Sequence, residues 1–171
     1  MKKIYNLILL LMVAAACQPD EFPAIGKKNP VIPQLIGTWS IVSVKQTDND
    51  AQRKGFPLFA QTQDLTQYFP YQDFNITLNT NESGSPGTFS VTLGNSPNIL
   101  GGITSGLWNV DNENFPSALT FSENDLQSTV EIGSLAEIGA GKLELKVIRY
   151  QDTSKGPQPV ITYDYLLSKT N

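Results

Sequence analysis

The sequence predicts an all-β domain, a single eight-stranded antiparallel up-and-down barrel with a long loop after its first strand. From residue 35 onward, apolar and polar residues alternate in short runs, which is the period of a half-buried strand. Clusters of Gly, Asn, Asp and Ser separate these runs as hairpin turns do. Closing the sheet into a barrel would remove both exposed edges, and a two-sheet β-sandwich is the alternative architecture.

Eight segments carry the strand pattern: 39–45, 74–78, 89–93, 106–110, 119–121, 130–132, 143–147 and 161–167. Turn residues gather at 79–87, 94–102, 111–114, 123–125, 139–141 and 152–159. A helical turn is expected only at residues 62–69, with Thr62 as its cap, because Pro57 and Pro70 limit its length. Short sequential hairpins favour a meander, and no segment has the length of a Greek-key crossover.

Residues 1–16 have the pattern of a secretory signal peptide, in which Lys2 and Lys3 precede an apolar stretch. This stretch is shorter than the roughly 20 apolar residues that a transmembrane helix needs. It ends in Ala14-Ala15-Ala16-Cys17, which resembles the bacterial lipobox. The resemblance implies cleavage before Cys17 and a lipid anchor on its thiol; ordinary secretion with a free Cys17 is the alternative.

Residues 17–33 are predicted to form a flexible tether, since four prolines in this stretch favour an extended chain. Asp20 and Glu21 follow the cysteine closely and resemble the surface-export signal of Bacteroidetes lipoproteins. The expected location is therefore the bacterial cell envelope, as an outer-membrane lipoprotein exposed at the surface. A plain polar tether is the alternative interpretation. The barrel domain is expected over residues 34–171.

Composition excludes several classes of function. The chain has no histidine and one cysteine, which removes histidine acid–base chemistry, the usual zinc sites and disulfides. Loss of Lys2 and Lys3 reduces twelve basic residues to ten, against sixteen acidic ones, so the mature net charge is −6. Such a chain is not expected to bind nucleic acid, and its membrane attachment would come from acyl chains. No cofactor and no metal are predicted.

Two Gly-x-Trp motifs carry a resemblance to a known family. The segment 35–44, with Gly37-Thr38-Trp39, resembles the opening of lipocalin-like domains, and Gly106-Leu107-Trp108 is similar to a later strand of lipocalin-like lipoproteins of Bacteroidetes. The resemblance covers residues 34–169. It implies a barrel whose closed end is plugged by Trp39 at the start of the first strand, with Gly37 beside it. The later lipocalin signatures are missing, although residues 162–165 are reminiscent of one.

Aromatic residues concentrate in the long loop that is expected after the first strand. Six of the sixteen aromatic residues fall between positions 56 and 74. We predict that the loop covers the barrel mouth and that a ligand contacts these rings together with Trp108; the rings proposed are Phe56, Phe59, Tyr68, Phe69 and Tyr71. The alternative is that they cap the core, and flat exposed rings would instead fit a carbohydrate-stacking platform.

The acidic residues do not define a catalytic centre. Residues 48–50 and 111–114 are oxygen-rich and could hold calcium, but neither has a complete calcium-loop spacing, and Asp and Asn also dominate ordinary turns. No carboxylate pair with the spacing of a glycosidase stands out, and no phosphate-binding loop is present. The chain is therefore not expected to be an enzyme.

These observations predict a lipid-anchored, non-catalytic envelope protein that binds a small apolar or amphipathic ligand in the barrel cavity. The alternative is a surface interaction module whose exterior contacts a glycan or another envelope protein. The first function requires space inside the barrel. The second requires an exposed aromatic or apolar patch.

Overall fold

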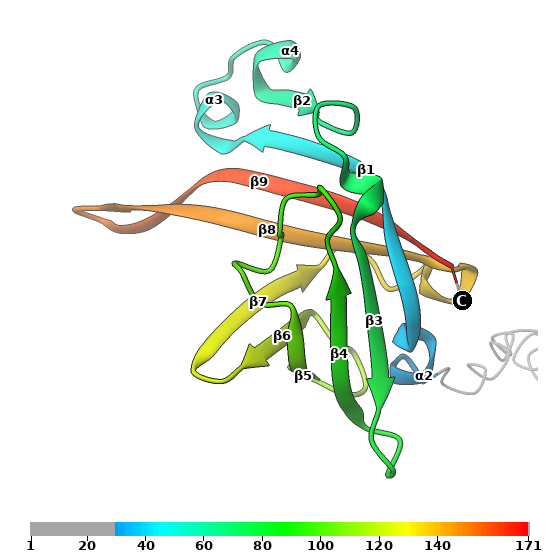
Figure 1. Cartoon of the computed structure of the whole chain (residues 1–171). Coiled ribbons are helices and arrows are strands. Elements are labelled where there is room, and N and C mark those ends of the chain that lie inside the picture. Colours follow the sequence, from blue (N-terminus) through cyan, green and yellow to red (C-terminus); the bar gives the residue numbers. More distant parts are fainter. Residues whose placement is uncertain (1–29, 171) are drawn as a thin grey trace, which may run out of the picture.

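A computed structural model describes residues 30–170 of the chain (Figure 1). The predicted signal peptide, Cys17 and most of the tether lie outside these residues. The described part has nine strands: β1 (Gly37–Asp48), β2 (Thr62–Asp64), β3 (Asn75–Thr80), β4 (Pro86–Thr92), β5 (Ser105–Val110), β6 (Ala118–Glu123), β7 (Leu126–Ile132), β8 (Lys142–Thr153) and β9 (Gly156–Lys169). Its helical turns are α2 (Ile32–Leu35), α3 (Asn49–Arg53), α4 (Leu58–Gln61), η1 (Tyr71–Asp73) and η2 (Ile138–Ala140).

The sheet closes into an eight-stranded antiparallel barrel. Its order is β1-β3-β4-β5-β6-β7-β8-β9, and β1 returns to pair with β9. The ninth strand, β2, pairs only with the C-terminal part of β1. The predicted up-and-down barrel is therefore confirmed, and the two-sheet sandwich is excluded because the ladder has no break between sheets.

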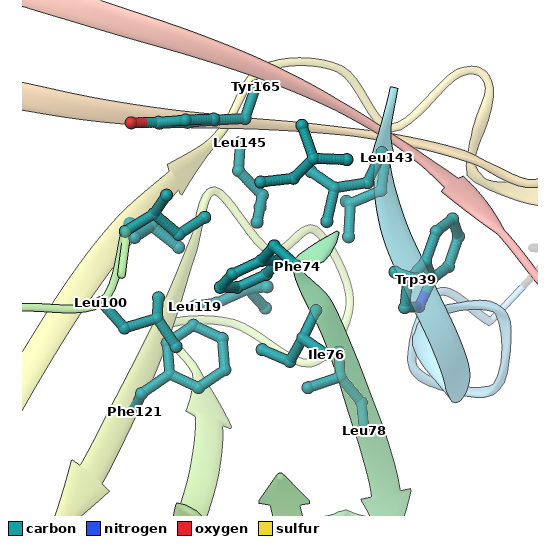
Figure 2. Packing of buried hydrophobic residues seen from close by; sticks show 14 of the residues in the cluster. Trp39, Phe74, Ile76, Leu78, Leu100, Leu119, Phe121, Leu143, Leu145 and Tyr165 are labelled. Atoms are coloured by element: carbon teal, nitrogen blue, oxygen red, sulfur yellow. The ribbon is translucent and has the colours of Figure 1, made fainter. Parts of the chain in front are cut away.

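The barrel interior is filled by its own side chains. Every second residue of the strands points inward, as the alternating pattern requires, and Figure 2 shows these side chains packed against one another. Phe89 and Phe121 meet edge to face with their ring centroids 4.9 Å apart. Leu100, from the loop between β4 and β5, also points into this cluster. The largest side chains that are almost fully buried are Trp39, Phe74, Phe121, Leu35, Ile41, Ile76, Leu78, Leu100, Ile103, Leu119, Ile138 and Leu143.

Trp39 closes the end of the barrel at which β1 begins. Its side chain is fully buried, and its Nε1–H donates to the Leu35 carbonyl oxygen at 2.8 Å, which ties β1 to α2. The Lys169 ammonium lies 5.3 Å from the indole centroid, in cation–π range, and donates to the Gln34 carbonyl at 3.1 Å. Ile32 is buried here as well, so the folded part includes two residues, Ile32 and Pro33, that the sequence assigned to the tether.

Both Gly-x-Trp motifs place a glycine where the backbone has a positive φ, 121° at Gly37 and 136° at Gly106. At Gly106 an added Cβ would lie 2.0 Å from the Ser122 carbonyl oxygen on β6. A side chain would therefore push β5 and β6 apart, and only glycine fits there. The tryptophan two residues later points inward in each strand, because side chains alternate between the two faces.

The helix predicted at residues 62–69 is wrong. Residues Thr62–Asp64 form β2, with Thr62 opposite Thr47 of β1. β1 continues past the barrel and offers a free edge there, so this short segment gains a backbone ladder instead of a helical turn. The helical turns lie earlier, at α3 and α4, and the residue that caps α3 is Asp48, whose Oδ1 accepts from the backbone N–H groups of Asp50 and Ala51.

The turn predicted at residues 152–159 is also wrong in extent. β8 and β9 run on to a tight hairpin at residues 154–155, so most of this segment is strand. Pro157 and Pro159 are tolerated because β9 pairs with β1 only from Ile161 onward, which leaves the two prolines on an unpaired edge. The Arg53 guanidinium of α3 covers this edge and donates to the Pro159 carbonyl at 2.8 Å.

We predict that Trp39→Phe lowers the free energy of unfolding by about 1–3 kcal/mol, because it shrinks a buried ring and leaves the Leu35 carbonyl without its donor. Urea unfolding followed by circular dichroism measures this. The control is Leu126→Ala, at an exposed position, where a change within about 0.5 kcal/mol is expected. Equal stabilities of the Trp39→Phe variant and the parent chain would contradict the closing role of Trp39.

Candidate functional site

Residues 49–70 form a lobe outside the barrel, which we call the aromatic lobe. It contains α3, α4 and β2 and sits at the end of β1 opposite α2 (Figure 1). The N-terminal part of β1 pairs with β3, whereas its C-terminal part pairs with β2. The lobe therefore rests on the part of β1 that extends beyond the barrel wall.

The structure separates the predicted ligand-binding residues into two groups. Phe56, Phe59, Tyr68 and Phe69 are 48–86% exposed on the aromatic lobe, with Phe59 the most exposed. Leu58, which the sequence did not single out, is 71% exposed beside them in the chain. Tyr71 and Trp108, by contrast, are buried.

Tyr71 belongs to the core beneath the lobe. Its ring meets Tyr165 of β9 edge to face at 6.0 Å between centroids, and Phe69 at 5.7 Å. Burial, and to a lesser extent the neighbouring Tyr163 hydroxyl, raise the pKa of Tyr71, and burial is also the main cause that raises the pKa of Tyr165. These phenols therefore stay protonated at neutral pH and act as packing groups.

Trp108 lies far along the chain from the lobe residues and faces inward from β5. Its Nε1–H donates to the Asn79 carbonyl oxygen at 2.7 Å, which links β5 to the end of β3. One edge of Trp108 lines an outer groove of about 510 Å³ together with polar residues such as Asn81 and Asn109. The structure thus does not bring Trp108 together with the aromatic lobe residues.

Local contacts hold the backbone of the turn before α4 in place. The Phe56 N–H donates to the Ala51 carbonyl at 3.0 Å, and the Gln61 side-chain amide donates to the Phe56 carbonyl. Asp50 pairs with Lys54 at 2.5 Å and with Arg53 at 3.3 Å. The hydrogen bond from Lys54 is the main cause that lowers the pKa of Asp50. The turn that presents Phe56, Leu58 and Phe59 is therefore ordered by α3.

A pocket of about 310 Å³ lies beside Phe59, between α4 and the extended part of the sheet. Gln46 of β1 and Gln63 of β2 are register partners and lie on the same face. Within residues 30–170 neither side-chain amide has a hydrogen-bond partner. The remaining lining residues are Asp48, Ala60, Gln61 and Thr62. Sequence reasoning missed these glutamines, because only the β1–β2 register brings them together.

In the two predicted oxygen-rich loops, side-chain oxygens accept hydrogen bonds from nearby residues of the chain. Besides Asp48 at α3, Asp111 accepts from the N–H groups of Ser117 and Ala118 and from the Ser117 hydroxyl. The Asn112 side chain accepts from the Asn114 N–H at 2.8 Å. In the described part of the chain, no three His, Cys, Asp or Glu side chains are grouped as they would be to hold a metal ion.

Comparison with protein-family models found no match, and comparison with curated proteins found none either. Among residues 30–170, no helix has the length and apolar character that crossing a membrane requires.

We predict a pH-dependent role for Asp111. The Ser117 hydroxyl, helped by backbone N–H donors, lowers the pKa of Asp111 from its ordinary 3.8 to about 2. A lowered pKa means that the carboxylate stabilises the folded state above the ordinary value, and that this contribution is lost as the pH falls toward 2. Asp111→Asn should therefore lower the melting temperature at pH 7, and the difference from the parent chain should shrink between pH 4 and 2. A difference that is the same at all pH values would contradict this account.

Proposed function

We propose that this chain is a lipid-anchored, non-catalytic protein of the bacterial outer membrane, and that its barrel serves as a surface interaction module. The aromatic lobe would contact a glycan or another envelope protein. The observation that carries the proposal is the exposure of five large apolar or aromatic side chains between residues 56 and 69. Lipid attachment at Cys17 is part of the proposal because residues 14–17 resemble a lipobox.

Because these side chains stay in water, the folded state does not gain the free energy of unfolding that their burial would add. Full burial of one such side chain contributes roughly 1.5–3 kcal/mol. The same segment does bury other large side chains in the core, since Leu65 and Tyr71 are buried. Several exposed large apolar side chains within one short segment are typical of a surface that a partner covers.

The position of the lobe fits a partner away from the membrane. The predicted tether precedes α2 in the chain, β1 begins directly after α2, and the lobe follows the end of β1 (Figure 1). β1 has twelve residues, which span roughly 40 Å at the usual rise of a strand. An anchor at Cys17 would therefore attach the domain through the end of the barrel opposite the aromatic lobe.

The titration behaviour of the acidic groups supports a non-catalytic role. A carboxyl group that acts as a general acid near neutral pH needs a raised pKa. In the described part of the chain, every carboxyl group with a clearly shifted pKa is shifted downward, and the groups concerned are Asp50, Asp64, Asp111 and Glu123. Hydrogen-bond donors are the main cause in each case, so these carboxylates are held in the ionised form.

The small-ligand hypothesis receives less support from the geometry. Its binding space would lie where Phe74, Leu119, Phe121 and their neighbours pack against one another (Figure 2). A ligand there would have to displace side chains packed at the density of a protein core. Binding of a small apolar molecule inside the barrel stays a prediction, and the aromatic lobe is the better supported contact surface.

Hydroxyl-radical footprinting tests the proposed function. The full chain would be labelled in intact cells and again after purification in detergent. We expect Phe56, Phe59 and Tyr68 to be labelled several-fold less in cells, because a partner covers them there. Leu107, 59% exposed on the outer wall of the barrel, is the internal control and should be labelled alike in both samples. Equal labelling of the three aromatic residues in both samples would contradict the proposal.

A further inference from the structure

We propose that the pocket beside Phe59 binds a neutral saccharide. This inference rests on the proposed function, because it names the chemical class of partner that the aromatic lobe contacts. The pocket lies between α4 and the end of the β1–β2 ladder, outside the barrel. It is therefore distinct from the cavity that the small-ligand hypothesis requires.

The first observation is a pair of amides that line the pocket together. Gln46 and Gln63 stand opposite each other on β1 and β2, so their side chains leave the sheet on the same face. Each primary amide offers two N–H donors and a carbonyl acceptor. Neither amide hydrogen-bonds to another group within residues 30–170; Gln46 is half-buried and Gln63 is exposed, so both are open to a ligand. A ligand that presents donors and acceptors together, as neighbouring sugar hydroxyls do, matches this pair.

The row of side chains continues across the sheet. Gln46 is also the register partner of Tyr163 on β9, so Tyr163, Gln46 and Gln63 lie side by side on one face. Neighbouring strands are roughly 4.8 Å apart. Of this row, Gln46 and Gln63 line the pocket, and Tyr163 packs against the core beside Gln46.

The second observation is the ring at the edge of the pocket. Phe59 is 86% exposed, the highest value among the large hydrophobic residues of the described chain, and it lines the same pocket as the two glutamines. The hydrogen bond from Gln61 to the Phe56 carbonyl holds α4 against the preceding turn. An aromatic face at the rim of a pocket can cover the C–H face of a sugar ring and exclude water from it.

The third observation is the charge of the pocket. Asp48 is its one ionisable lining residue, and its Oδ1 already accepts two backbone N–H groups at 2.9 Å. No lysine or arginine lines the pocket. An anionic ligand would therefore bring its charge into the pocket without a cationic partner, at a cost in solvation. These features favour a neutral ligand over a phosphate, a uronic acid or a nucleic acid.

The test uses the full chain in a detergent without a sugar headgroup, since alkyl glycosides would compete for the site. Short neutral glucans, mannans and galactans are titrated, with an acidic oligogalacturonate as the charged comparison, and binding is followed by calorimetry. We expect at least one neutral oligosaccharide to bind. Phe59→Ala should weaken that binding by about tenfold, the loss expected for one stacked ring. Gln63→Ala should weaken it as well.

The matched control is Phe115→Ala, which removes another exposed ring from the loop between β5 and β6. It should leave saccharide binding unchanged, and all three variants should keep the parent melting temperature. The inference is overturned if no neutral oligosaccharide binds, if the acidic one binds more tightly, or if Phe59→Ala and Gln63→Ala bind as the parent chain does. Protection of the lobe in cells without saccharide binding would overturn this inference and leave the proposed function standing, with a protein as the partner.

Discussion

β1 pairs with β9 along nearly the whole length of β1, from Trp39 with Lys169 to Asp48 with Ile161, and this contact closes the sheet. Closure removes the free edges of the outer strands and lets the inward side chains form one core. Both strands are also longer than the barrel wall is tall. Their extra length carries β2, α3 and α4, so the same pairing that completes the barrel also supports the aromatic lobe.

Side chains fill the interior of the barrel, and the candidate binding surface lies outside it, on the aromatic lobe. Inward positions carry bulky residues such as Phe74 and Phe121, and the loop between β4 and β5 adds Leu100 and Ile103 to the same core. A barrel of eight strands has just enough room for side chains or for one small ligand, and here side chains take that room. The pocket lined by the two glutamine amides and the exposed Phe59 ring lies instead where β1 leaves the barrel, beside α4.

The strands could be predicted from sequence because each one is a local pattern: Phe74, Ile76 and Leu78 alternate with polar residues whatever their neighbours are. The two wrong secondary-structure predictions concern segments whose conformation depends on pairing with strands that are distant in the sequence. Thr62–Asp64 form a strand only because β1 extends beside them, and Pro157 and Pro159 fit a strand only because that edge of β9 is unpaired. The Gln46–Gln63 pair was missed for the same reason, whereas the aromatic residues of the loop were found from composition alone.

Native mass spectrometry tests most directly whether the chain's own side chains fill the barrel interior. The chain would be isolated from its own host, and the measurement would be repeated across growth conditions. The account predicts that the chain appears with its lipid anchor and without a retained apolar molecule. A sugar adduct that disappears in the Phe59→Ala variant would agree with the account. A small apolar molecule that stays bound in that variant would contradict it, because such a molecule has to occupy the space that the core side chains fill.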